Sequence, residues 1–119
     1  MSGEDAATVL DQFIHDVANL PAEIAHLLEE IHAKDELIAE CRAVITNRDN
    51  QLQKHVKQAG GHVKHPKEDQ YVKLVQANFA TAEKLQEDKV GLSVKACFLV
   101  CTFFFILSLN IAQLANATH

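Results

Sequence analysis

The sequence is poor in the residues that interrupt helices. Its 119 residues include four glycines, two prolines, one tyrosine and no tryptophan. No stretch alternates apolar and polar residues as a half-buried strand does, whereas Ala, Leu, Glu, Gln and Lys dominate the first 95 residues and favour helix. These absences argue against a sheet and predict an all-α chain, long enough for one domain with a narrow core.

Signals for catalysis, secretion and metal binding are also lacking. The three cysteines, Cys41, Cys97 and Cys101, form no disulfide framework, which indicates a reducing compartment. The first 20 residues carry four acids and no basic region of the signal-peptide type. There is no phosphate loop, dinucleotide motif or Ser-His-Asp set, and thin helices offer no concave site. We therefore expect no enzymatic activity.

What the sequence does contain is a seven-residue repeat. Isoleucine or leucine recurs every seven positions from 24 to 52, which places these side chains on one helix stripe. A two-stranded zipper would place leucine three residues after each stripe position. The residues found there are Leu27, Lys34, Cys41, Arg48 and His55, so the second seam position is poor. The helix is therefore expected to form one wall of a hairpin or bundle. The predicted partner interface comprises Ile24, Leu28, Ile31, Ile38, Ile45, Leu52 and Val56.

Proline and glycine predict where the helices begin and end. Pro21 suits the first turn of a helix, so we expect a short helix over 4–19, a corner at 20–21, and a long helix over 21–58. Gly60 and Gly61 should end the long helix, and Pro66 should open a third helix that reaches at least residue 92. The short connection implies antiparallel neighbours. The predicted fold is a long antiparallel helical hairpin, of coiled-coil type, with a short N-terminal helix and an apolar C-terminal helix.

Charge is distributed unevenly along this chain of net charge −5. Residues 1–33 carry seven acids and no lysine or arginine, whereas residues 54–67 carry no acid. The middle segment predicts a basic hairpin tip that could touch DNA phosphates or an acidic protein, or simply remain solvated. The overall negative charge argues against a dedicated nucleic-acid binder. The basic tip comprises Lys54, Lys57, Lys64 and Lys67.

Two groups of potential metal ligands are better explained by solvation or by packing than by metal binding. His55, His62 and His65 are spaced H-x6-H-x2-H without a nearby cysteine, which matches no strong zinc pattern, so we expect a solvated loop. Cys97 and Cys101 share a helix face inside an apolar run and are expected to pack. We therefore predict no metal site.

The last quarter of the chain differs in composition from the rest. Residues 96–118 contain no charged residue, and 97–109 read CFLVCTFFFILSL. This segment is long and apolar enough to be a transmembrane candidate, although Asn110 and Gln113 fall within the same window. The possible membrane span comprises Cys97, Phe98, Phe103, Phe104, Phe105, Ile106 and Leu107.

Several motifs together resemble a known family. They are TVLDQFIHDVANLPAEI at 8–24, EEIHAKDELIAEC at 29–41, ITNRDNQLQKHVK at 45–57, HPKE at 65–68 and NFATAEKLQEDKVGLS at 78–93. In order and spacing they resemble the N-terminal domain of inhibitor-of-growth proteins, most of all fungal subunits of the nucleosome acetyltransferase type. The resemblance covers residues 8–93 and divides the chain into a helical domain, 4–93, and an apolar tail, 94–119.

The resemblance implies a non-catalytic nuclear scaffold. In this family the helical domain docks into histone acetyltransferase or deacetylase complexes, some members dimerise through it, and a zinc-binding PHD finger follows that reads methylated histone tails. This sequence contains no such finger, so neither zinc nor methyl-lysine reading is carried over. The expected partners are acetyltransferase-complex subunits and a possible second copy, with only indirect or weak nucleosome contact.

The tail departs from the family pattern, which should continue with mixed charged and apolar residues. A tail anchor would make the protein a coiled-coil adaptor on an intracellular membrane, and Lys84, Lys89 and Lys95 agree with the positive-inside tendency. Translation of an unspliced intron or a shifted frame would also give Phe, Leu, Ile, Val and Cys. The coincident change of composition and resemblance favours this second explanation. A third possibility is an unrelated soluble homodimeric coiled coil.

Overall fold

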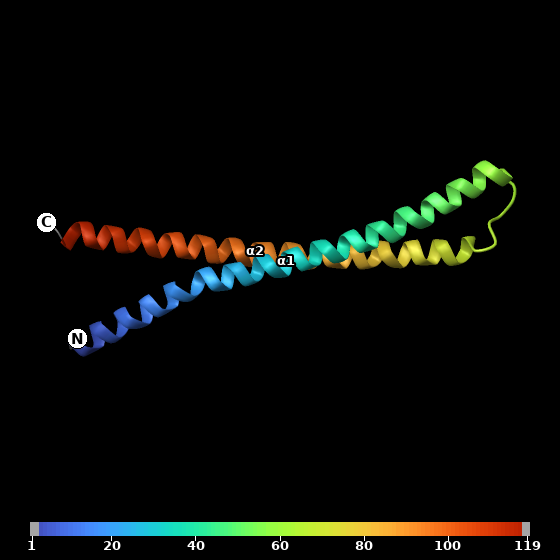
Figure 1. The fold of residues 1–119 in the computed structure, drawn as a ribbon. Coiled ribbons are helices and arrows are strands. Elements are labelled where there is room, and N and C mark those ends of the chain that lie inside the picture. Colours follow the sequence, from blue (N-terminus) through green and yellow to red (C-terminus); the bar gives the residue numbers. More distant parts are fainter. Residues whose placement is uncertain (1–2, 118–119) are drawn as a thin grey trace. The chain divides into compact units, whose positions relative to one another are not determined.

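The protein folds into two long helices. The structure, a computed structural model, describes the backbone of residues 3–117 and, within that range, every side chain except those of residues 3–6, 9, 13, 114 and 117. Helix α1 spans Gly3–Ala59 and helix α2 spans Glu68–Ala117 (Figure 1). Residues 3–117 contain no strand. The prediction of an all-α fold built on long helices is therefore confirmed.

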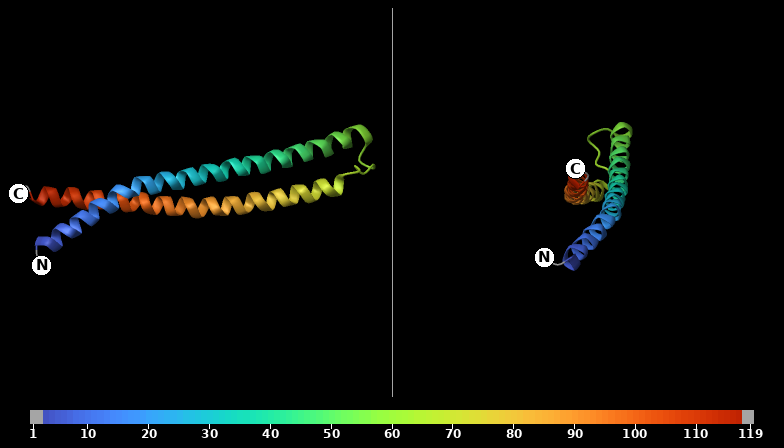
Figure 2. Two further views of the ribbon diagram at one scale, coloured as in Figure 1. Left: turned by 60° about the horizontal axis from the view of Figure 1, so that its bottom comes forward. Right: turned by 90° about the vertical axis from the view of Figure 1, so that its left-hand side faces the viewer.

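Packing divides the chain into two units. The hairpin unit is His32–Val90 and contains the loop, whereas the terminal unit combines Met1–Ile31 with Gly91–His119. In the hairpin unit the two helices run side by side in opposite directions, and the loop joins them (Figures 1 and 2). The antiparallel arrangement predicted from the short connection is confirmed there.

The core of the hairpin unit is formed by residues from a single turn of each helix. Ile38 and Cys41 of α1 and Leu85 of α2 are each less than one-tenth exposed, and the partly buried Ala82 packs against them. The pairs lie three residues apart on their helices, so each presents one face to the other helix. Lys89 of α2 also forms an ion pair with a carboxylate of α1, that of Asp35. The core is narrow, as expected for two helices.

The terminal unit has an even smaller interior. Leu27 of α1 and Ala96 of α2 are its buried apolar residues among those described. Ala22, His26 and Leu27 of α1 line a shallow groove together with Lys95 and Leu99 of α2. Among the described side chains of this unit, little apolar surface is therefore removed from water.

The predicted corner at residues 20–21 is wrong, because α1 continues through Pro21 without a break. A proline inside a helix loses one hydrogen bond and crowds the carbonyl four residues earlier, at a cost of about 3 kcal/mol. Val17, Leu20 and Ile24 are half-buried, and with Leu27 they follow one helix face across the proline. A continuous helix keeps this face together, whereas a corner would split it. There is consequently no separate short N-terminal helix.

The loop is slightly longer than predicted. Gly60 ends α1 with a positive φ of 82°, and its N–H donates to the Val56 carbonyl at 3.0 Å. This is the left-handed conformation that glycine adopts at low cost. Helix α2 begins at Glu68 rather than at Pro66, after a turn in which the Glu68 N–H donates to the His65 carbonyl at 3.0 Å.

The apolar C-terminal helix is present as the second half of α2. The helix passes residue 93 without interruption and continues to Ala117. The change in composition therefore does not coincide with a change in secondary structure.

Candidate partner interface

The seven-residue stripe lies largely on the inner side of the hairpin. Ile38 is buried, and Ile45 and Leu52 are half-buried beside residues of α2. Ile24 and Ile31, in the terminal unit, are also half-buried. Within the hairpin unit, α2 therefore covers much of the stripe that was predicted to contact a partner. Of the predicted interface, Leu28 and Val56 are the exposed members.

Towards the loop the seam opens into an apolar groove. Ile45 and Leu52 line it from α1, and Val72, Val75 and Phe79 line it from α2, with Thr46, Asp49 and Gln76 at its polar edge. Phe79 remains 58% exposed although it lies in this groove. A groove with such a lining can accept the side chains of another helix, in the way that helix ridges fill grooves.

Large apolar side chains are exposed along both helices. Leu37 of α1 lies beside the buried Ile38 but points outward, and Val90 and Val94 of α2 are almost two-thirds exposed. Leu37, Phe79 and Val90 were not part of the predicted interface. The signal that could have identified them is a second apolar face on each helix, because a two-helix hairpin can cover only one. Exposed apolar faces of this kind are typical of helices that bind another protein.

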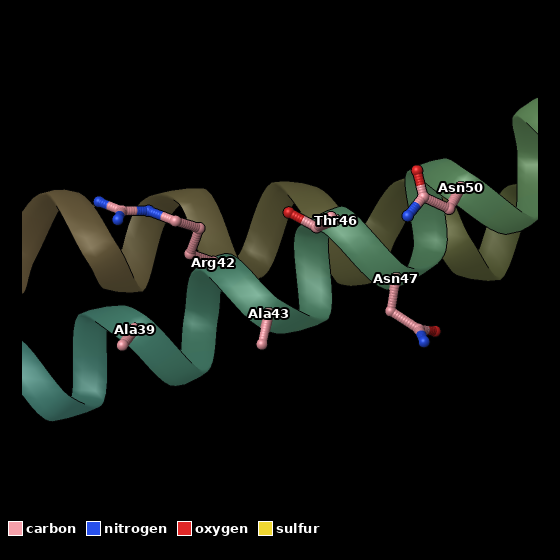
Figure 3. Close-up of a pocket in the computed structure, with 6 residues that line it drawn as sticks. All are labelled: Ala39, Arg42, Ala43, Thr46, Asn47 and Asn50. Carbon is pink, nitrogen blue, oxygen red and sulfur yellow. The ribbon is translucent and has the colours of Figure 1, made fainter.

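A second surface lies on α1 alone. Figure 3 shows small and polar side chains along one side of this helix, all of them exposed. Because these residues come from a single helix, they form an open face rather than a cavity, and we assign them no ligand. They are Ala39, Arg42, Ala43, Thr46, Asn47 and Asn50.

All four lysines of the basic tip are exposed, two in the last turns of α1 and two in the loop. The Lys64 ammonium donates to the Asp69 carboxylate at about 3 Å, and this hydrogen bond, together with the negative charge, raises the pKa of Lys64. Lys54, Lys57 and Lys67 have no ion pair within the described chain. The four lysines thus lie exposed at the loop end of the hairpin, next to Glu68 and Asp69 in the first turn of α2.

The histidines of the tip take part in local packing. The His55 Nε2–H donates to the Val63 carbonyl at 2.9 Å, and the Lys67 N–H donates to the His65 Nδ1 at 3.0 Å. Ring centroids lie 4.8 Å apart for His55 and His65, and 5.2 Å apart for His65 and Tyr71. His62 is exposed. Among the described residues, no group of three His, Cys, Asp or Glu side chains could hold a metal ion.

The predicted membrane span is an exposed part of α2. Cys97, Phe98, Phe104 and Phe105 are exposed, whereas Phe103, Ile106 and Leu107 are half-buried. Within the described residues, one stretch, Glu68–Gln113, contains a window apolar and long enough to cross a membrane, and little of that window is buried. Length and composition alone do not separate a span from an unpartnered apolar helix. Cys101, one turn from Cys97, is also exposed.

Comparison with known proteins places this hairpin in a family. The family model described as "Inhibitor of growth proteins N-terminal histone-binding" matches residues 9–114. Chromatin modification-related protein YNG2 of Candida albicans is 39% identical over 110 residues, which are 92% of this chain and 37% of that protein. The YNG2 protein of Saccharomyces cerevisiae is 36% identical over 110 residues, 92% of this chain and 39% of its own.

These matches correct one expectation and set one limit. The resemblance was expected to stop near residue 93, but the family model extends 21 positions further, to residue 114. A related protein of Schizosaccharomyces pombe, chromatin modification-related protein png1, is 29% identical over 93 residues, or 78% of this chain and 33% of its own. The chain thus spans less than half the length of the curated relatives that it matches. The match over most of its residues shows that this chain belongs to the inhibitor-of-growth family.

Proposed function

We propose that the chain is a non-catalytic scaffold of a nuclear histone acetyltransferase complex, and that it acts by packing its exposed helix faces against other subunits. One observation carries the proposal: large apolar side chains stay exposed in a chain whose relatives are named for chromatin modification. Phe79, Phe98, Phe104 and Phe105 are each more than half exposed. A folded chain rarely leaves so many large rings in water unless a partner covers them.

The energetics favour a long interface over a small contact. Complete burial of a phenylalanine contributes about 1.5–3 kcal/mol, so covering the remaining exposed part of four rings gives roughly 5 kcal/mol. Association itself costs about 4–15 kcal/mol. Four rings therefore offset only the lower end of this cost, and stable assembly requires further residues such as Leu37 and Val90. Extended helices that pack along much of their length supply this kind of surface.

The scaffold proposal is tested by purification of the tagged protein from cells of its source. Phe79→Ser should lose the acetyltransferase subunits that the unmodified protein recovers, because the groove then lacks its largest apolar side chain. Gln86→Ser, an exposed position of the same helix, is the matched control and should retain them. If the recovered proteins contain no acetyltransferase subunit, or if both variants recover the same set, the proposal is wrong.

The apolar tail favours a second candidate, an adaptor anchored in an intracellular membrane. Its support is the uncharged and mostly exposed second half of α2. Alkaline carbonate extraction distinguishes the two candidates, since an anchored protein stays with the membrane pellet and a scaffold is released. Sedimentation of the purified chain tests the remaining candidate, a homodimeric coiled coil, which should sediment at twice the mass of the chain.

We also infer that residues 94–117 belong to the same helical domain as residues 4–93. The support is the family match through residue 114 and the unbroken course of α2. Translation of noncoding sequence would give such a match only by chance. Sequencing of the spliced transcript across the codons for residues 90–119 tests this inference, and a transcript without the tail codons would overturn it.

A further inference from the structure

We propose that the hairpin tip, residues 54–67, is a docking surface for the phosphodiester backbone of duplex DNA. Residues 50–67 hold four lysines and no acid, although the chain as a whole has a net charge of −5. The acids that border the tip are Asp49 on α1, eight residues or about 12 Å before Lys57, and Glu68 and Asp69 in the first turn of α2, where Asp69 pairs with Lys64. At about 12 Å the charge of Asp49 is largely screened from Lys57 at physiological salt. The proposal is independent of the scaffold function.

The lysines are placed where a phosphate could reach them. Lys54 and Lys57 lie in the last turns of α1, and Lys64 and Lys67 lie in the loop that faces away from the hairpin (Figure 1). All four are exposed. Lys64 is already paired with Asp69, which leaves three lysines of the tip without an ion pair in the described chain. These three are the strongest candidates for phosphate contacts.

The loop that carries them is held in place by its neighbours. The Arg48 guanidinium lies 5.0 Å from the centre of the Tyr71 ring, which stacks on His65, which in turn meets His55. His55 donates to the Val63 carbonyl, so this series of contacts links α1, the loop and α2. A surface that is already ordered loses little conformational entropy on binding. This order distinguishes the tip from a flexible solvated loop.

The chemistry of the tip favours DNA over an acidic protein. Lysine is a point charge on a flexible stem, and it binds phosphate without the fixed bidentate geometry that arginine uses. Duplex DNA presents one negative charge per about 1.7 Å of its axis. Several lysines spread over a tip can therefore each find a phosphate without a fixed register.

The number of lysines sets the expected salt dependence. Each phosphate contact contributes about −0.9 to the slope of log affinity against log salt. The three unpaired lysines predict a slope of about −2.7, so a fourfold increase in salt should weaken binding about 40-fold. Such binding does not depend on sequence and is typically weak, with Kd between about 10⁻⁴ and 10⁻⁶ M at physiological salt.

The experiment measures fluorescence anisotropy of a labelled duplex of about 25 base pairs, titrated with the full chain at several salt concentrations. The variant Lys57→Gln with Lys67→Gln removes two unpaired charges from the tip and should reduce the steepness of the slope by about 2. The matched control, Arg42→Gln with Lys95→Gln, removes two exposed charges that lie outside the tip and have no ion pair within the described chain, and it should leave both slope and affinity unchanged. Circular dichroism confirms that both variants are equally helical.

Three results would overturn the proposal. The first is no binding at about 50 mM salt, and the second is an equal loss in the tip variant and in its control. The third is displacement of the DNA by polyglutamate as effectively as by unlabelled DNA of the same charge, which would assign the tip to acidic proteins instead. Loss of affinity and slope in the tip variant alone, with weak competition by polyglutamate, is the supporting result.

Discussion

Two neighbouring residues of α1 should lose very different amounts of stability on the same substitution. Ile38 is 6% exposed and belongs to the core with Cys41 and Leu85, whereas Leu37 is 44% exposed. We consider Ile38→Asp and Leu37→Asp, which introduce the same charge one residue apart. The helix propensity of aspartate lowers stability by a similar amount in both variants, so this contribution cancels in the comparison.

The difference in burial gives the difference in stability. Loss of the buried Ile38 side chain costs about 1.5–3 kcal/mol, and a carboxylate in its place must lose water or take up a proton, which adds a few kcal/mol. Because the two-helix core is narrow and water can approach it, we expect the lower end, about 4 kcal/mol in total. The half-exposed Leu37 should lose about 1 kcal/mol. A natural domain has only about 5–15 kcal/mol of stability to lose.

Urea denaturation followed by circular dichroism measures this difference. With a urea dependence of about 1.5 kcal/mol per molar, the midpoint of Ile38→Asp should lie about 2 M below that of Leu37→Asp. Purification from cells gives the complementary result, because Leu37→Asp should keep the hairpin but weaken partner binding. Equal midpoints for the two variants would refute the assignment of Ile38 to an intramolecular core, and the stripe would then be free for a partner.

Other substitutions test the ends and joints of the helices. Pro21→Ala should raise helicity and stabilise the chain by up to about 3 kcal/mol, as measured by thermal denaturation, since it restores a helix hydrogen bond; no gain would indicate a corner. Gly60→Ala should cost about 1 kcal/mol because of the positive φ, whereas Gly61→Ala should be nearly neutral in the same urea titration. Arg48→Ala should lower the free energy of unfolding by about 0.5–1 kcal/mol, because the contact of the guanidinium with the Tyr71 ring is lost. Arg48→Lys should lower it less, since the charge remains. An equal loss in both variants would argue that the planar guanidinium, and not the charge, stabilises this contact.

The sequence predicted the end of the long helix better than its beginning. Gly60 ended the long helix within one residue of its predicted end, because a glycine pair gives a local signal that needs no tertiary contact. Pro21 gave an equally local signal that the structure overrides, since half-buried residues on both sides of it share one face. Local rules thus predicted the loop and failed at the proline, where packing across several turns decides the course of the helix.

The candidate interface was harder to predict for a physical reason. Periodicity shows that a stripe is covered, but a helix of the same chain and a helix of a partner leave the same pattern. Ile38 and Ile45 belong to the intramolecular seam, whereas Phe79 and Leu37, outside the stripe, stay exposed. The exposed positions could have been predicted only by counting apolar faces. Each helix carries two such faces, and in a two-helix hairpin one face of each helix is left without a neighbour.

The polar residues that interrupt the seam have a structural role at the loop. A zipper would need leucine at 48 and 55, yet Arg48 lies over the Tyr71 ring and His55 bonds to the Val63 carbonyl and packs on His65. Polar groups at seam positions lower stability but favour one register, since a shift by one turn leaves them unpartnered. In this hairpin they tie the end of α1 to the loop and to the start of α2. The same contacts order the basic tip. The polar residues that interrupt the coiled-coil pattern therefore also hold in place the surface that we assign to DNA.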